Sequence, residues 1–174
     1  MRALVAGIGN IFLGDDAFGV EVARRLSERG VPEGVCVQDF GLRGFDLACA
    51  LCEPWDLVIL VDAASRRGQP GSVYLIDPDL NGKKDNSEVF SDPHGLNPIH
   101  AIQLAKTMGT ITARVLLVGC EPISFESEGQ VAALSAPVAA AVETALETID
   151  RLIGEFQEPR HAVGSMSGGS HAIQ

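Results

Sequence analysis

The segment from Leu57 to Val61 is an uninterrupted apolar run that closes at Asp62. A strand with one exposed face alternates apolar and polar residues, whereas a strand buried on both faces is apolar throughout. The run therefore predicts a strand in the interior of a sheet that is covered by helices on both sides. Sheets of this kind are built mainly from parallel strands joined by helices.

The rest of the chain alternates between strand and helix patterns. Apolar runs predict further strands at residues 2–6, 35–38, 72–76 and 114–118, and helical spacing predicts helices at 18–29, 45–51, 98–108 and from Ser135 to about 153. The link between residues 61 and 72 is short and has no helical pattern, so the 72–76 strand is expected to be antiparallel at an edge. These patterns predict an α/β three-layer sandwich with a five-stranded, mostly parallel sheet, one antiparallel edge strand, and helices on both faces.

Length and composition predict one domain. Residues 1–156 are expected to form it, and residues 157–174, rich in Gly and Ser, are expected to be a flexible tail. A net charge of −10 argues against nucleic acid as a partner. No apolar run reaches the roughly 18 residues of a membrane span, and the apolar segment at the N-terminus is too short for a signal peptide. A cytoplasmic monomer is expected.

Acidic residues follow the predicted strands. Asp15 and Asp16 come after the first strand, Asp39 after the second and Asp62 after the third, while a long polar loop carries His94. Ligands of open α/β sheets bind beyond the carboxyl ends of the strands. These side chains are therefore expected to converge at one edge of the sheet.

Asp16, Asp62 and His94 would make an oxygen-rich set with one imidazole, which suits a divalent first-row metal. Asp39 is a candidate acid/base, because it stands on the neighbouring strand end among other carboxylates. Each acid also has a structural alternative. One of Asp15 and Asp16 is expected only to cap the following helix, and Asp39 or Asp62 could simply form a turn.

Two other kinds of site are disfavoured. The segment Gly7-Ile8-Gly9 resembles half of a dinucleotide fingerprint, but Phe12 replaces its third glycine, and two carboxylates stand where a pyrophosphate would bind. Cys49 and Cys52 have CxxC spacing without a second pair, so reduced, packed thiols are expected there and at the two remaining cysteines, Cys36 and Cys120. No cysteine or serine stands in a nucleophile-plus-base pattern.

Taken together, five segments resemble the motifs of the hydrogenase maturation proteases. They are Gly7–Gly19 with its Asp15-Asp16 pair, Asp39–Gly44, Val61-Asp62-Ala63, Asp92-Pro93-His94, and Gly119–Pro122 together with Leu134-Ser135. The resemblance covers residues 1 to about 153. This chain has Asp16 where the family commonly has Glu, and Leu42 where the family often has Thr.

The resemblance implies an endopeptidase that removes the C-terminal extension of a nickel-iron hydrogenase large-subunit precursor after nickel insertion. The partner would be that precursor, and the nickel would arrive with it rather than as a resident cofactor. By position, Asp16, Asp62 and His94 would contact the nickel. The alternatives are a metal-binding accessory protein without catalysis and, less favoured, a nucleotide-binding α/β domain.

Overall fold

The computed structural model describes residues 1–78, 80, 97–125 and 133–157. In chain order its elements are β1 (Ala3–Ile8), the 3-10 helix η1 (Gly14–Ala17), α1 (Phe18–Arg29), β2 (Val35–Gly41), α2 (Gly44–Leu51), β3 (Leu57–Ala63), β4 (Val73–Ile76), α3 (Pro98–Met108), β5 (Arg114–Cys120) and α4 (Ala136–Gln157). Of the loop predicted to hold His94, residues 79 and 81–96 lie outside the described part. Residues 158–174 of the predicted tail lie outside it as well.

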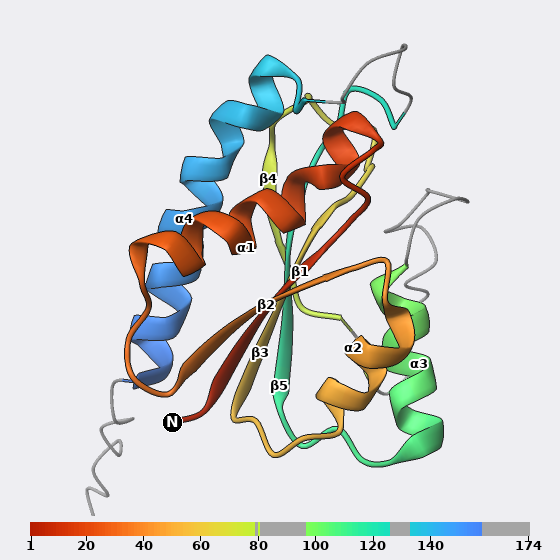
Figure 1. The fold of residues 1–174 in the computed structure, drawn as a ribbon, viewed down its shortest axis with the longest axis vertical. Coiled ribbons are helices and arrows are strands. Elements are labelled where there is room, and N and C mark those ends of the chain that lie inside the picture. The colour runs from red at the N-terminus through yellow and green to blue at the C-terminus, as the bar shows by residue number, and fades with distance from the viewer. Residues whose placement is uncertain (79, 81–96, 126–132, 158–174) are drawn as a thin grey trace, which may run out of the picture.

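The five strands form one sheet in the order β2-β1-β3-β5-β4. β1 pairs in parallel with both β2 and β3, and β3 pairs in parallel with β5. β4 runs antiparallel to β5 at the edge. Helices α1 and α4 cover one face of the sheet, and α2 and α3 cover the other (Figure 1). The predicted three-layer sandwich is confirmed, including its antiparallel edge strand.

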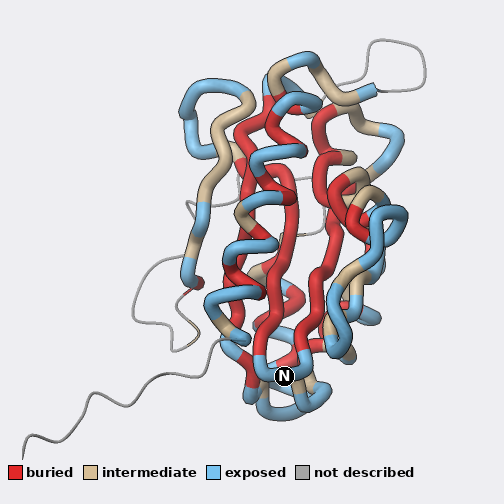
Figure 2. Tube along the Cα trace, turned by 90° about the vertical axis from the view of Figure 1, so that its left-hand side faces the viewer, coloured by how far each residue is buried: buried red, intermediate tan, exposed pale blue. Residues whose placement is uncertain are grey.

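The core consists of two aliphatic layers, one on each side of the sheet. β1 and β3 are buried along their whole length, as the red central strands in Figure 2 show. Alternate residues of β3 belong to different layers: Ile59 and Val61 pack towards α1 and α4, while Val58 and Leu60 pack towards α2 and α3. This two-sided burial is the reason why the Leu57–Val61 run has no polar residue.

Four strands extend further than the sequence patterns indicated. β1 ends at Ile8 rather than Ala6, β2 at Gly41 rather than Gln38, β3 at Ala63 rather than Val61, and β5 at Cys120 rather than Val118. Main-chain pairing continues past the last apolar side chain, with Gly7 opposite Asp39 and Asp62 opposite Gly119. Asp39 and Asp62 therefore lie inside their strands, which corrects the prediction that they follow them.

Helix α1 lies very close to the sheet at Gly19. A Cβ at this position would be 2.1 Å from the carbonyl oxygen of Val61 and 2.3 Å from that of Ile8. Only glycine allows this approach. The start of α1, and the η1 turn just before it, are thereby held against the carboxyl ends of β1 and β3.

In the part of the chain that the structure describes, no helix combines the length and apolar character needed to span a membrane.

Candidate functional site

Among the described residues, four carboxylates are buried near the carboxyl edge of the sheet, and two of them, Asp16 and Asp62, are predicted metal contacts. Asp16 lies in η1 and Asp62 lies in β3, and each is only 4% exposed. η1 packs against β3, so the two residues belong to neighbouring elements. One oxygen of the Asp16 carboxylate accepts a hydrogen bond of 2.7 Å from the backbone N–H of Asn10. A buried carboxylate needs such donors or a cation to offset its lost hydration.

Asp39 occupies a different position at the same edge. It is exposed on the edge strand β2, two strands away from Asp62. Side chains alternate between the two faces of a strand. Asp39 is therefore on the same face as Val35 and Val37, which is covered by α1, whereas Asp62 is on the face covered by α2. The Asp39 carboxylate makes no hydrogen bond or ion pair with any described residue, so it does not hold the turn before Gly41 together.

His94 lies outside the described residues. Within the described ranges, no group of three His, Cys, Asp or Glu side chains is arranged to hold a metal ion. The structure thus gathers Asp16 and Asp62 at one edge, with Asp39 nearby on the other face. A third contact to a metal from His94 stays a prediction.

Asp15 connects η1 to two segments that are distant along the chain, a role that the sequence did not suggest. Its buried carboxylate accepts hydrogen bonds from the backbone N–H of Ser135 (2.7 Å), the Ser135 hydroxyl (2.9 Å) and the backbone N–H of Ile123 (2.8 Å). One of Asp15 and Asp16 was expected only to cap the following helix, and the hydrogen bonds of Asp15 go instead to two distant segments. It joins η1 to the segment after β5 and to the start of α4, and so fixes the position of its neighbour Asp16. The only hint in the sequence was that Asp15 and Ser135 both fall in motif segments.

Replacing Asp15 by alanine is expected to lower the free energy of unfolding by about 3 kcal/mol, because two backbone N–H groups lose a charged acceptor. Ser135→Ala removes only the hydroxyl bond and should cost about 1 to 2 kcal/mol. Urea denaturation of the two variants and the wild type measures both values. Equal stability of Asp15→Ala and the wild type would contradict this role.

Glu121, at the end of β5, is a second buried carboxylate with a structural role. It accepts hydrogen bonds from the backbone N–H of Arg66 (2.8 Å), the Tyr74 hydroxyl (2.9 Å) and the Ser65 hydroxyl (3.3 Å). Burial by itself would raise the pKa of Glu121, but these bonds and one from the backbone of Gly68 hold the pKa below its ordinary value of 4.5. Glu121 therefore stays ionised at neutral pH and organises the loop after β3.

The lowered pKa predicts a pH dependence of stability. A carboxylate whose pKa is lower in the folded state stabilises the fold above the unfolded pKa and loses this effect as pH falls through the folded value. The difference in unfolding free energy between the wild type and Glu121→Gln should therefore be constant from neutral pH down to about 5 and shrink below about 4.5. Denaturation at a series of pH values tests this, and a difference that grows on acidification would contradict it.

The four cysteines are all free thiols, but they are not all packed as expected. Cys36 and Cys49 are exposed, and Cys52 is partly buried. Cys120 is the buried one, and burial together with the charges of Asp15 and Glu121 raises the pKa of its thiol to about 12. A thiol of that pKa is protonated at neutral pH and is a poor nucleophile.

The first loop is built around its own backbone rather than around a phosphate. Gly9 has a positive φ of +136°, and a Cβ there would lie 1.8 Å from the carbonyl oxygen of Asp16. The space beside the glycine is thus filled by an acceptor oxygen, which would repel a phosphate. This geometry is unlike that of a dinucleotide-binding loop.

Comparisons with known proteins agree on one family. A family model described as hydrogenase maturation protease matches residues 20–152. The Hydrogenase 2 maturation protease of Escherichia coli K12 is 30% identical, over 86% of this chain and 88% of its own length. The solved structure of the hydrogenase maturating endopeptidase HybD from E. coli superposes with a TM-score of 0.73 at 29% identity, covering 90% of this chain and 94% of that one.

A second solved structure, the [NiFe] hydrogenase maturation protease HycI from Thermococcus kodakarensis, has a TM-score of 0.66 at 28% identity and covers 88% of this chain and 92% of that one. The family model spans most of the sheet and its helices, and the relatives match over nearly their whole lengths. With its fold and its pair of buried carboxylates at the carboxyl edge, the chain belongs to the hydrogenase maturation protease family.

Proposed function

We propose that this protein is the endopeptidase that removes the C-terminal extension from a nickel-loaded large-subunit precursor of a nickel-iron hydrogenase. It would act in the cytoplasm as a monomer. The observation that carries the proposal is the pair of buried carboxylates, Asp16 and Asp62, at the edge of a maturation-protease fold. Two carboxylates withdrawn from water at one edge favour a cation as the group they meet.

In this proposal the nickel belongs to the substrate. Asp16, Asp62 and His94 contact it and so distinguish a loaded precursor from an empty one. Carboxylate oxygens with one imidazole suit such an ion and leave positions open for a peptide carbonyl or water. The related solved structures are a hydrogenase maturating endopeptidase and a [NiFe] hydrogenase maturation protease.

The reaction requires a water oxygen to bond to the peptide carbonyl carbon, the C–N bond to break, and a proton to reach the leaving amine nitrogen. Nickel held near the carbonyl oxygen would polarise it. Asp39 is the proposed acid/base: its carboxylate takes the proton from water and then returns it to the amine. Its exposure and its lack of hydrogen bonds to described residues support this role.

The test is incubation of the purified protein with nickel-loaded and nickel-free precursors, followed by mass spectrometry of the products. The expected result is loss of a C-terminal fragment from the loaded precursor alone. A loaded precursor that binds but keeps its full mass would instead identify a metal-dependent accessory protein without catalysis.

A further inference from the structure

Three large apolar side chains are exposed beside the candidate site. Ile11 and Phe12 in the loop after β1 are 53% and 74% exposed, and Leu42 in the loop after β2 is 49% exposed. We call these three residues the apolar rim. Single exposed apolar residues are common, but a group of them at one place marks an interaction surface.

The apolar rim surrounds a groove of about 400 Å³ between the two loops. Val20 and Phe40 line the groove as well, so apolar atoms continue inward from the rim. The two loops are joined at their base, where the backbone N–H of Gly9 donates to the carbonyl of Gly41 (3.1 Å).

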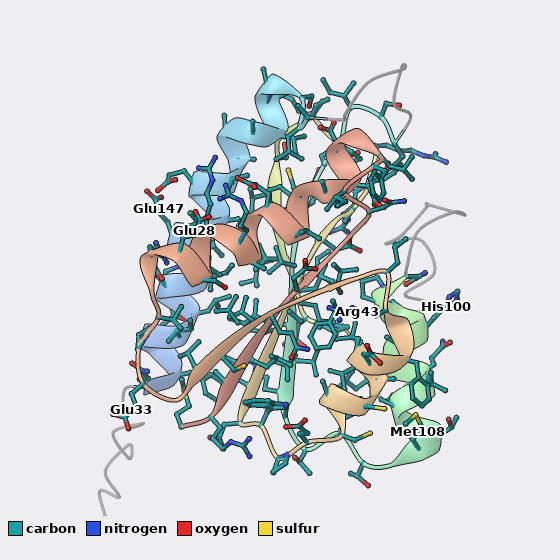
Figure 3. The ribbon with its side chains drawn as sticks, in the orientation of Figure 1. Glu28, Glu33, Arg43, His100, Met108 and Glu147 are labelled. Carbon is teal, nitrogen blue, oxygen red and sulfur yellow. The ribbon has the colours of Figure 1, made fainter. Side chains whose placement is uncertain are left out.

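Each wall of the groove is also fixed internally. Asn10 accepts a hydrogen bond from the backbone N–H of Phe12 (3.0 Å), and Arg43 donates to the backbone carbonyls of Phe40 and Asp39. Figure 3 shows Arg43 where the β2 loop enters α2. The groove is therefore formed before any ligand arrives.

The groove is continuous with the proposed catalytic edge. Asp39 is one of its lining residues. Asn10, in the opposite wall, donates its backbone N–H to the carboxylate of Asp16. A side chain lying in the groove would consequently be close to a peptide bond at this edge.

The volume of the groove limits the kind of occupant. The volume lies at the lower end of small-ligand pockets, roughly 300–1,000 Å³. It suits one or two side chains of an extended peptide.

We propose that the groove is a specificity site that receives an apolar side chain of the precursor, in the extended segment next to the cleaved bond. This inference rests on the proposed function and adds a substrate determinant to it. The groove binds a part of the precursor that does not react, so it contributes to substrate binding rather than to the chemical step.

The first test compares steady-state cleavage of the loaded precursor by wild type and by the double variant Phe12→Ala/Leu42→Ala. The expected result is a fall in kcat/KM of about 10-fold or more, carried by KM with little change in kcat. Met108→Ala is the matched control, because Met108 is an exposed apolar residue at the far end of α3 (Figure 3). The control should cleave like the wild type. Denaturation curves check that all variants fold.

The second test exchanges specificity. After the cleaved bond has been mapped with the wild type, each apolar residue next to it is replaced by lysine in separate precursors. One of these precursors should be cleaved poorly by the wild type and regain activity with Leu42→Asp, which places a carboxylate in the groove. Recovery of none of them would overturn the specificity site.

The outcomes separate the two proposals. If the wild type cleaves the precursor and the double variant cleaves it with the same kcat/KM, the groove inference is wrong and the proposed function stands. If the wild type cleaves no precursor, the proposed function fails and the inference fails with it. If the wild type is a dimer by size-exclusion chromatography and the double variant a monomer, a second copy of the chain occupies the groove, and the inference is overturned.

Discussion

Asp39→Asn is expected to slow cleavage of the nickel-loaded precursor by about 10²-fold or more, because the amide cannot accept and return a proton. Affinity for the loaded precursor should survive, since Asp16, Asp62 and His94 remain. The fold should survive as well, because the Asp39 carboxylate makes no hydrogen bond to any described residue. Single-turnover cleavage and calorimetric binding measure the two properties separately.

Asp46→Asn is the matched control for Asp39→Asn. Asp46 is an exposed acid in the next element, 4.0 Å from the Arg43 guanidinium, and exposed ion pairs of this kind contribute little. Turnover by Asp39→Asn at the wild-type rate would remove Asp39 from the mechanism. Asp39 lies on the α1 face of the sheet, and Asp62 lies on the α2 face. A substrate that contacts both residues must therefore extend across the edge of the sheet.

Asp62→Asn and His94→Ala are expected to remove the preference for the nickel-loaded precursor. Loss of one metal contact should weaken binding of the loaded form by about 10²-fold and leave binding of the nickel-free form unchanged. His94→Ala should abolish processing, because the same contact is needed at the cleavage step. Calorimetric titration with the two precursor forms measures the preference directly.

Both variants are expected to keep the fold, for different reasons. Asparagine has nearly the shape of the buried Asp62 side chain, and His94 stands in the polar sequence Asp92-Pro93-His94-Gly95, which has little apolar surface to pack. Denaturation curves should therefore stay close to that of the wild type. If either variant still prefers the loaded precursor by the wild-type ratio, that residue does not contact the nickel.

The sequence by itself determined the architecture. The apolar run Leu57–Val61 required burial on both faces of a strand, and this required helices on both sides of the sheet. The short link after β3 required β4 to be antiparallel. Acids near the ends of successive strands indicated the edge of the sheet at which the candidate site is proposed. These features are local, because periodicity and connection length are properties of neighbouring residues.

Other features depended on tertiary structure. Strand ends were predicted too early because backbone pairing with a neighbour, rather than the last apolar side chain, ends a strand, and this placed Asp39 and Asp62 inside β2 and β3. The resulting alternation put the two acids on opposite faces, which a list of strand ends does not show. The sequence did not indicate the role of Asp15 for a related reason: its hydrogen-bond donors, Ile123 and Ser135, are more than a hundred residues away along the chain.

The apolar rim illustrates the same division. Ile11, Phe12 and Leu42 are apolar letters in two separate loops, and apolarity in a sequence normally indicates burial. Only the parallel pairing of β1 with β2 brings their loops together and leaves these side chains exposed around one groove. The sequence thus specified which elements form and in which layers they pack. The tertiary structure decided which distant residues meet, because contacts between remote segments depend on how the elements are placed in three dimensions.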